Sequence, residues 1–280
     1  MIILILLVLG LCFGSFVNAY VWRVYKAQNP SKPSRGKKHA KDTDKYSLLH
    51  GRSMCPDCEH ELAARDLIPV LSWLSLRGKC RYCHKTISWQ YPLVELATAG
   101  LFVLSYLAWP EAMNTEQWVY LGFWLAYVVG FMALSVYDLR WMILPNVMLW
   151  PLTILAMLQV VVTCIWQGSA DPLLTAFWGV LIGGGLFYVL FQLSAGKWIG
   201  GGDVKLGALL GLIVGGPMPA ILLLFTSSLI GTLVALPLMV TGKAKRTSKL
   251  PFGPFLIAGG YLVFLFGARV LDWYNGLVGF

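Results

Sequence analysis

The sequence predicts an all-α polytopic membrane protein with about eight transmembrane helices and one polar loop after the first of them. Hydrophobic residues fill 58% of the 280 positions and charged residues only 12%, which is about half the charged share of soluble domains. Most of the apolar runs are about 20 residues long, the length that crosses a bilayer. Basic charge is concentrated near the N-terminus, where 14 of the 22 Lys and Arg lie between Arg23 and Lys85. This composition excludes an ordinary soluble enzyme and a disordered or collagen-like chain.

The first apolar run, residues 1–22, is expected to be an uncleaved transmembrane helix whose N-terminus faces outward. A signal peptide would carry basic residues before its apolar stretch, whereas here the basic residues follow the run. Residues 23–91 are polar and form the loop. Its early part, roughly 26–50, is predicted to be a mobile linker because it is rich in basic residues and contains prolines.

The rest of the chain, 92–280, is predicted to be a transmembrane bundle. One of its runs has only about 13 residues, so seven spans remain an alternative to eight. The expected runs are 92–110, 118–137, 147–166, 173–193, 204–216, 218–241 and 253–273.

The distribution of Lys and Arg predicts the orientation, since cytoplasmic loops carry the excess of positive charge. With eight spans and an outward N-terminus, the loops on one side and their immediate flanks hold 21 of the 22 basic residues. We therefore expect the loop 23–91 to be cytoplasmic and both termini to face outward. Disulfides are not expected in that reducing compartment.

Cysteine spacing indicates a metal site in the loop. Two C-x-x-C pairs stand 21 residues apart, Cys55 with Cys58 and Cys80 with Cys83. Two such pairs fit a tetrahedral four-thiolate zinc site, and a full set of thiolates makes it structural because no coordination position stays open. Two redox dithiols, or cysteines without metal, are the alternatives. His60 and His84 could replace a thiolate but are expected to be surface residues.

Three acidic residues lie in or at the cytoplasmic edges of the apolar runs: Glu95, Asp138 and Asp203. Ionisable groups there are costly and mark functional sites by default. Two neighbouring carboxylates can share one proton, so one can serve as general base on water and the other as general acid on an amide. The alternatives are an ion pair with Arg140 or simple interfacial placement for Asp138, and an N-cap of a helix beginning at Val204 for Asp203.

Glycines flank Asp203 on both sides. The glycines before it, which would let another backbone approach closely, are Gly200, Gly201 and Gly202. The segment lacks the GxxxxGK[ST] pattern of a phosphate-binding loop. After Asp203, a four-residue repeat predicts close helix packing through Gly207, Gly211 and Gly215.

Together these motifs resemble the bifunctional type IV prepilin leader peptidase and N-methyltransferase family, an aspartic-type membrane protease. The matching segments, in order, are GSFVN at 14–18 with Arg23, the two C-x-x-C pairs enclosing DLIPVLSWL at 66–74 and LRGKC at 76–80, IS at 87–88 with YPLVE at 91–95, Asp138 with ILPN at 143–146, and GGGDVKL at 200–206. Asn146 is a departure, because many members have Asp there.

The resemblance implies removal of a short basic leader from prepilins and pseudopilins at the cytoplasmic membrane face. It further implies methylation of the new N-terminal amine with S-adenosylmethionine as donor. Asp138 and Asp203 are then the catalytic pair, supported by Lys205 and the three glycines before Asp203. Glu95 becomes a candidate for binding the methyl donor. The long cysteine-bearing loop favours both activities, since single-activity archaeal-type relatives generally lack it.

The domain organisation implied is a first helix at 1–22, a methyltransferase-associated loop with the zinc knuckle at 23–91, and an aspartic peptidase bundle at 92–280. Expected partners are prepilins and pseudopilins as substrates and membrane lipids, with no nucleic acid, in the bacterial inner membrane. Two alternatives stay open: a peptidase without methylation, and a non-enzymatic membrane scaffold that recruits partners through the zinc knuckle.

Overall fold

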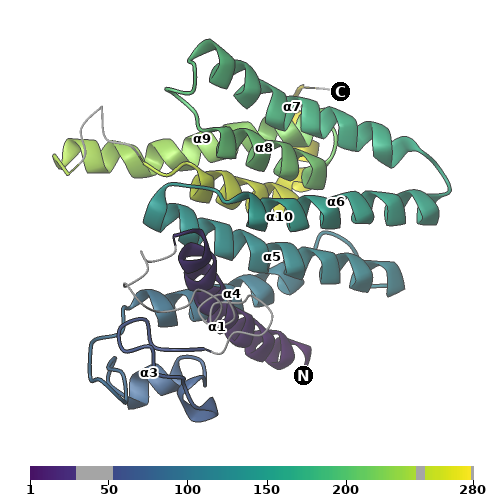
Figure 1. Ribbon diagram of the computed structural model, residues 1–280. Helices are drawn as coiled ribbons and strands as arrows, with labels where there is room; N and C mark the ends of the chain where they lie inside the picture. The colour runs from purple at the N-terminus through teal and green to yellow at the C-terminus, as the bar shows by residue number, and fades with distance from the viewer. Residues whose placement is uncertain (30–52, 244–249, 279–280) are drawn as a thin grey trace. The chain divides into compact units, whose positions relative to one another are not determined.

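A computed structural model describes residues 1–29, 53–243 and 250–278, so most of the predicted linker at 26–50 lies outside the described residues. The chain divides into two compact units, Met1–Leu107 and Ala108–Phe280. Within the described ranges there are helices and two isolated β-bridges but no β-strand (Figure 1).

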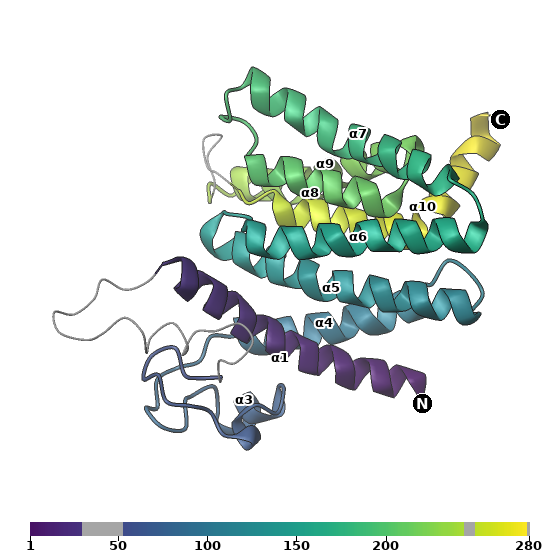
Figure 2. The ribbon, with the colours of Figure 1, turned by 45° about the vertical axis from the view of Figure 1, so that its right-hand side comes forward.

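The first unit is built on two long helices that pack against each other (Figure 2). Glycines spaced four apart lie on the same side of a helix and allow this close approach. A Cβ on Gly14 would lie 2.6 Å from the Glu95 Cα, and one on Gly10 would lie 2.5 Å from the Ala99 Cα. The elements of the unit are α1 (Ile2–Gln28), a 3₁₀ turn η1 (Ala64–Asp66), a short α3 (Leu71–Ser75) and α4 (Gln90–Leu107).

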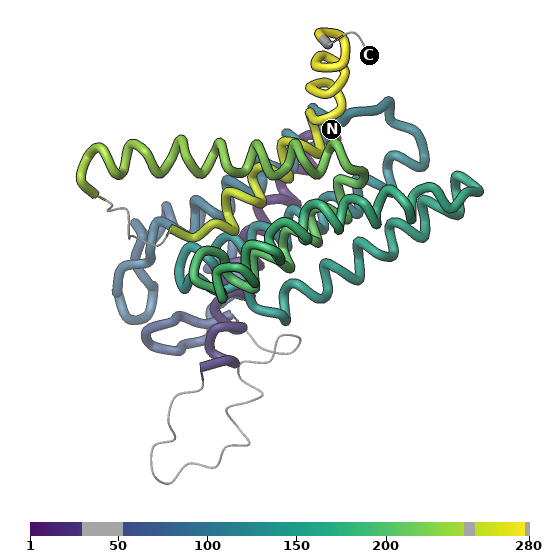
Figure 3. Tube along the Cα trace, turned by 90° about the horizontal axis from the view of Figure 1, so that it is seen from above, coloured from purple at the N-terminus to yellow at the C-terminus, as the bar shows by residue number. Residues whose placement is uncertain are grey.

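The second unit is a helical bundle in which α7 packs on α8 and α9 packs on α10 (Figures 1 and 3). Its helices begin at recognisable signals. Asn114 caps α5 by accepting the Gln117 N–H at 2.8 Å, and proline stands in the first turn of α7 and of α9. The helices are α5 (Thr115–Trp141), α6 (Asn146–Gln167), α7 (Asp171–Leu193), α8 (Gly201–Val214), α9 (Pro217–Val240) and α10 (Gly253–Val278).

Glycine lets α7 and α8 meet backbone to backbone. A Cβ on Gly207 would lie 2.5 Å from the Gly183 carbonyl oxygen, and Gly211 stands as tightly against Gly179. The predicted close packing is confirmed for these two members of the repeat. Gly215, the third member, instead ends α8 with a positive φ of 62°.

The all-helical membrane fold is confirmed, with the cysteine-bearing segment after the first helix. Six helices are long and apolar enough to cross a membrane: α1, α5, α6, α7, α9 and α10. The expected count of eight is not confirmed, because the other two runs form α4, of 18 residues, and α8, of 14 residues. At about 1.5 Å per residue α8 is about 21 Å long, short of the roughly 30 Å hydrocarbon core.

Candidate functional site

The four cysteines of the loop come together as one cluster, and their thiol sulfurs lie within 4.8 Å of one another. The Cys55 and Cys83 sulfurs are 3.9 Å apart. Tetrahedral metal–sulfur bonds of about 2.3 Å place sulfurs about 3.8 Å apart, so this spacing fits a metal held by four thiolates. All four cysteines are free of disulfides.

Each cysteine pair sits on a tight turn, and the two turns repeat the same hydrogen-bond pattern. In the first turn the Cys55 N–H donates to the His60 carbonyl, and the Glu59 N–H donates to the Cys55 carbonyl. In the second turn Cys80 bonds to Lys85 and His84 to Cys80 in the same way, and all four distances are 2.9–3.0 Å. The residue four positions after the first cysteine has a positive φ in both turns, 54° at Glu59 and 58° at His84. We call these two turns, 54–61 and 79–86, the knuckles; each is closed by an isolated β-bridge.

The two histidines beside the cysteines are exposed. His60 stacks on Tyr82 with ring centroids 3.7 Å apart, and the metal-ligating group that the structure assembles contains cysteines alone. The prediction that His60 and His84 are surface residues is confirmed.

Ion pairs fasten the knuckles to each other and to the segment between them. Lys85 donates to Asp57 at 3.1 Å and joins one knuckle to the other. The Asp66 carboxylate accepts hydrogen bonds from Arg81 Nε at 2.7 Å and from the Tyr82 hydroxyl at 3.1 Å. Burial acts to raise the pKa of Asp66, but these bonds from Arg81 and Tyr82 outweigh it, so the pKa lies below its ordinary value.

Glu95 is buried in the first unit, with 6% of its surface exposed. Its Oε2 accepts the Val70 N–H at 2.7 Å. Val70 has a φ of 60°, which is rare for a β-branched residue. The strained backbone just before α3 is therefore bound to α4 through this carboxylate.

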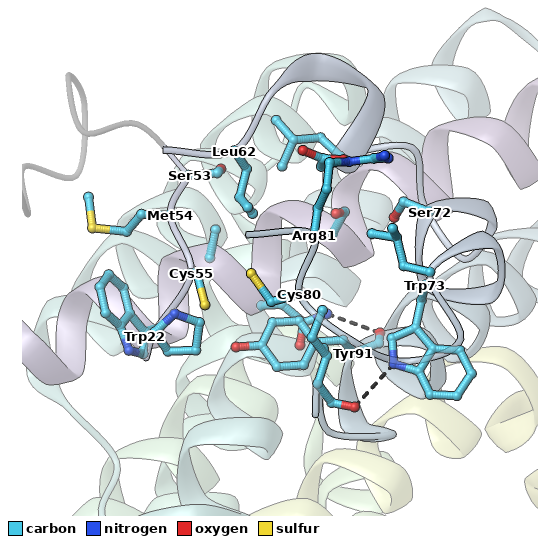
Figure 4. A pocket seen from close by; sticks show the side chains of 18 of the residues that line it. Trp22, Ser53, Met54, Cys55, Leu62, Ser72, Trp73, Cys80, Arg81 and Tyr91 are labelled. Atoms are coloured by element: carbon cyan, nitrogen blue, oxygen red, sulfur yellow. Dashed lines mark hydrogen bonds and ion pairs between the residues drawn. The ribbon is translucent and has the colours of Figure 1, made fainter. Parts of the chain in front are cut away.

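A cavity of about 130 Å³ lies between α1, the knuckles and the start of α4, wholly within the first unit (Figure 4). Trp22 and Trp73 stand at opposite sides of it, and Cys55 and Cys80 lie between them. The Trp73 Nε1–H donates to the Ile87 carbonyl at 3.2 Å, which fixes the ring. The aromatic and charged side chains on its wall are Trp22, Arg23, Asp66, Trp73, Arg81, Tyr91 and Glu95.

In the second unit, Asp138 lies in the last turn of α5 with 5% of its surface exposed. Its Oδ2 accepts the N–H of Gly253, the first residue of α10, at 3.1 Å. A Cβ at Gly253 would lie 2.6 Å from that oxygen, so glycine is required there. Asp203 lies near enough for its charge to act on Asp138. The structure thus brings the two predicted carboxylates to one site.

Asp203 is not the N-cap considered as an alternative. The helix α8 begins at Gly201 with Gly200 as its N-cap, three residues earlier than the sequence indicated. Asp203 is the third helical residue, and its carboxylate accepts the Gly200 N–H at 3.3 Å. The three preceding glycines have distinct places: Gly200 caps the helix, Gly201 opens it, and a Cβ on Gly202 would lie 2.9 Å from Leu144.

The other candidates at this site are also placed. Lys205 donates to Asn146 Oδ1 at 2.8 Å, which joins the starts of α8 and α6. No ion pair joins Asp138 to Arg140 among the residues with assigned positions; Arg140 lies over the Trp141 ring, 5.6 Å from its centroid. The starts of α6, α8 and α10 therefore meet the end of α5, and helix starts carry the partial positive charge that favours carboxylates.

Sequence reasoning missed Gly253 at this site, and it gave Leu144 no role beyond its place in the ILPN segment. Leu144 stands against both Gly202 and Gly253. The dipeptide Gly253-Pro254 after a polar break is a helix-start signal, and it could have drawn attention to the backbone N–H that reaches Asp138.

Two family profiles match the chain. The one described as Bacterial Peptidase A24 N-terminal domain matches residues 8–109, which include the cysteine cluster and Glu95. The one described as Type IV leader peptidase family matches residues 125–236, which include Asp138 and Asp203.

Full-length relatives are similar over nearly the whole chain. A prepilin leader peptidase/N-methyltransferase of Aeromonas salmonicida is 32% identical, covering 95% of this chain and 91% of the relative. One of Pseudomonas aeruginosa is 32% identical over 99% and 95%. A type 4 prepilin-like proteins leader peptide-processing enzyme of Escherichia coli is 36% identical over 90% and 89%. No solved structure matches the chain.

Proposed function

This chain belongs to the prepilin leader peptidase/N-methyltransferase family, and from that premise we propose that Asp138 and Asp203 cut the leader peptide of a prepilin. The observation that carries the proposal is the pairing of these two carboxylates, both held by backbone N–H groups, where three helix starts meet one helix end. The substrates are type IV prepilins and pseudopilins with a short basic leader.

The pair provides the acid–base chemistry of amide hydrolysis. One carboxylate takes a proton from water while the water oxygen bonds to the scissile carbonyl carbon. The other, protonated, gives its proton to the leaving nitrogen as the carbon–nitrogen bond breaks. Because the two groups interact, their titration belongs to the pair.

Several neighbours position the pair. Gly253 donates its N–H to Asp138, and Gly200 donates to Asp203. Gly201 and Gly202 let α8 start against Leu144, and Lys205 fastens that start to α6. We assign them supporting roles, since none supplies a proton acceptor to the reaction.

The second activity is methylation of the new N-terminal amine, and we assign it to the first unit. S-adenosylmethionine is the methyl donor, and Glu95 is a residue that binds it. Held by Glu95, the donor would supply an electrophilic methyl group to the lone pair of the new N-terminal amine. The four-cysteine cluster binds zinc as a structural ion, because all four positions are thiolates.

The protein is a multi-pass membrane protein, which we place in the bacterial inner membrane with the carboxylate pair and the knuckles on the cytoplasmic side. The positive loops support this orientation. The loop 23–91 carries 14 basic and six acidic residues, and we propose that it binds anionic lipid head groups, as does the basic leader. Equal cleavage rates in neutral and anionic bilayers would contradict this lipid role. No nucleic acid partner is proposed.

Mass spectrometry of a co-expressed prepilin tests the proposed activities. With the wild type, the product should lack its leader and carry the added mass of one methylene group. With Asp138→Asn or Asp203→Asn the prepilin should stay uncut, while Asp171→Asn, at the start of α7, should process normally. An uncut prepilin with the wild type would favour the scaffold, and a cut but unmethylated product would favour a peptidase alone.

A further inference from the structure

We propose that residues 67–75, which include the short helix α3, insert their apolar side chains into the lipid surface beside α1. We call this segment the anchor. The inference rests on the proposed membrane placement of the loop 23–91 and adds to it the segment that enters the lipid. Every residue used in the argument lies within Met1–Leu107, one compact unit.

The anchor exposes large apolar side chains on one face. Leu71 and Leu74 are 63% and 56% exposed, and Ile68 is 47% exposed. They stand three residues apart in a stretch with helical hydrogen bonds, so they share a face. Trp73 and Leu76 line the cavity instead. The exposed face is therefore not needed to line the cavity, and apolar side chains gathered in this way mark a surface that contacts lipid or protein.

The knuckles do not share this character. Among their described residues, Tyr82 is the one large apolar side chain that is exposed, at 37%. Beyond the anchor, the other strongly exposed one before α4 is Trp89, at 67%. Its ring contacts that of Trp73, with the centroids 4.2 Å apart. Tryptophan is enriched where a protein meets the membrane–water interface, so Trp89 extends the apolar surface of the anchor in a way that suits lipid.

Contacts with α1 and α4 place the anchor at the level of the membrane. The Val70 N–H donates to Glu95 at 2.7 Å, and a Cβ on Gly14 would lie 2.6 Å from the Glu95 Cα. Gly14 precedes Trp22, where the apolar run of α1 ends, by a length of helix of about 12 Å. The helix α1 is long and apolar enough to cross a membrane. Interfacial helices bury their apolar face to a depth of about 5–10 Å, which agrees with this position.

The wall of the cavity indicates the same level. Ser15 and Ala19 of α1 line it together with Ser72 and Trp73 of the anchor. Figure 2 accordingly shows α3 beside α1 and not beyond its end. The exposed face of the anchor thus lies next to a stretch of α1 that belongs to its apolar run.

The charges around the anchor complement a bilayer surface. Arg65 precedes it, Arg77 and Lys79 follow it, and all three are exposed. Basic residues beside an inserted apolar face are attracted to anionic lipid phosphates. The anchor itself contains no acidic residue, and the neighbouring Asp66 is bound by Arg81. A surface that is apolar at its centre and basic at its edges fits lipid.

An inserted anchor holds the knuckles against the membrane surface. The proposed methylation needs them there, because leader removal frees the new amine at the membrane face. The anchor therefore gives the polar loop a fixed place at the membrane, although the loop itself does not cross it.

Hydroxyl-radical footprinting of the purified full-length wild type in lipid nanodiscs tests the anchor without any variant. Trp89 and Tyr82 form an internal comparison, because both are reactive aromatics and Trp89 is the more exposed of the two. In water Trp89 would be oxidised at least as fast as Tyr82. We expect its oxidation to be several-fold slower, with Leu71 and Leu74 protected too, because lipid covers them. Oxidation of Trp89 as fast as that of Tyr82 would overturn the anchor.

Two further conditions separate insertion from other kinds of cover. In nanodiscs of neutral lipid alone the protection should persist, since insertion depends on apolar contact. Protection that required anionic lipid would mean that charge alone holds the segment, and would overturn insertion. Protection that appeared only after a pilin was added would identify a protein-docking face and would also contradict the anchor.

Variants connect the anchor to the proposed activity. Leu71→Glu and Leu74→Glu should each raise Trp89 oxidation several-fold and lower pilin methylation, while leader cleavage stays unchanged. Thr86→Glu adds the same charge at an exposed knuckle position and should leave both as in the wild type. Metal content reports whether the knuckles remain folded.

Failure of the anchor and failure of the proposed methylation give different results. Unchanged Trp89 oxidation in both leucine variants, with metal bound, would overturn the anchor and leave methylation standing. A wild type that protects Trp89 but does not methylate pilin would refute the methylation and support the anchor.

Discussion

The carboxyl group of Asp138 depends on one residue 115 positions away. Gly253 gives it a backbone N–H at 3.1 Å, and a side chain at that position would collide with the accepting oxygen. The reactivity of the site is therefore set by where α10 begins as well as by the acid itself.

Replacing that glycine should disable the site with both acids in place. In Gly253→Ala, a Cβ 2.6 Å from Asp138 Oδ2 would displace the carboxylate, and a displacement of about 1 Å in a catalytic group costs about a hundred-fold in rate. The leader cleavage rate measures the effect. Gly276→Ala, in the same helix with no atom within 4 Å of the new Cβ, should cleave normally. Equal rates for the two variants would contradict the proposed contact.

Removing one cysteine of the cluster should reduce metal binding and methylation without reducing leader cleavage. In Cys58→Ser, a metal site of four thiolates loses one ligand, so we expect metal content and pilin methylation to fall while leader cleavage persists. Elemental analysis of the purified protein, together with mass spectrometry of the pilin, measures both. Cys164→Ser, in α6, removes a cysteine outside the cluster and should change neither. Unchanged metal content in Cys58→Ser would argue for cysteines without metal.

The ion pair of Asp66 predicts that the stability of the knuckles depends on pH. Its pKa is lower in the folded state than its ordinary value, so its ion pair stabilises fully above the unfolded pKa of about 4. That stabilisation is lost as the pH falls through the lowered value. The labelling rate of the cluster cysteines by a thiol reagent reports local unfolding.

In Asp66→Asn, labelling should be faster than in wild type above about pH 5, and the difference should shrink below about pH 4. Asp57→Asn removes an exposed pair, which contributes little, and should label nearly as wild type does. If the difference in labelling rate between wild type and Asp66→Asn instead grew as the pH fell, the proposed role of the Asp66 ion pair would be contradicted.

At the level of single residues, prediction succeeded where residue spacing or local hydropathy identifies the site. The C-x-x-C spacing identifies Cys55, Cys58, Cys80 and Cys83. The three acids at the membrane edge are identified by their apolar surroundings, where a charge is costly. Hydrogen-bond partners that come from distant parts of the chain leave no such signal in the sequence. The Val70 N–H reaches Glu95 across 25 positions, and only the folded chain shows it.

At the scale of elements, the apolar runs located every long helix in the described residues, because a helix that crosses a bilayer must be apolar along most of its length. The ends were less accurate, since they depend on caps and polar turns. The helix α8 starts at Gly201 because Gly200 and Asp203 close its first turn with mutual hydrogen bonds, a local interaction that hydropathy does not register. The count of eight spans remains unconfirmed for a different reason, because α4 and α8 do not reach the length and mean hydropathy of a membrane span.

The contact between α7 and α8 predicts a position-specific packing defect. In Gly183→Ala, the new Cβ would lie 2.6 Å from the Gly207 carbonyl oxygen, whereas in Gly185→Ala, two residues along the same helix, the nearest atom is a leucine methyl at 3.8 Å. We expect Gly183→Ala to destabilise the bundle by about 1–3 kcal/mol, and Gly185→Ala to stabilise its helix slightly. Thermal unfolding in detergent measures both; equal stability would contradict close α7–α8 contact.

At the scale of the whole molecule, the chain separates two kinds of chemistry into two compact units. The carboxylate pair lies in Ala108–Phe280, and the cysteine cluster with its cavity lies in Met1–Leu107. The sequence indicated two activities through the order of its motifs. It did not indicate that α1 and α4 join the loop in one unit, because that grouping follows from the packing of Gly10 and Gly14 against α4.

The most direct test of this account offers purified Asp138→Asn two substrates with S-adenosylmethionine: an intact prepilin, and the same pilin with its leader already removed. We predict that the intact prepilin stays uncut and unmethylated, while the leaderless pilin gains the mass of one methylene group at the wild-type rate. Failure of this variant, folded and with its metal bound, to methylate the leaderless pilin would contradict the separation of the two activities between the two units.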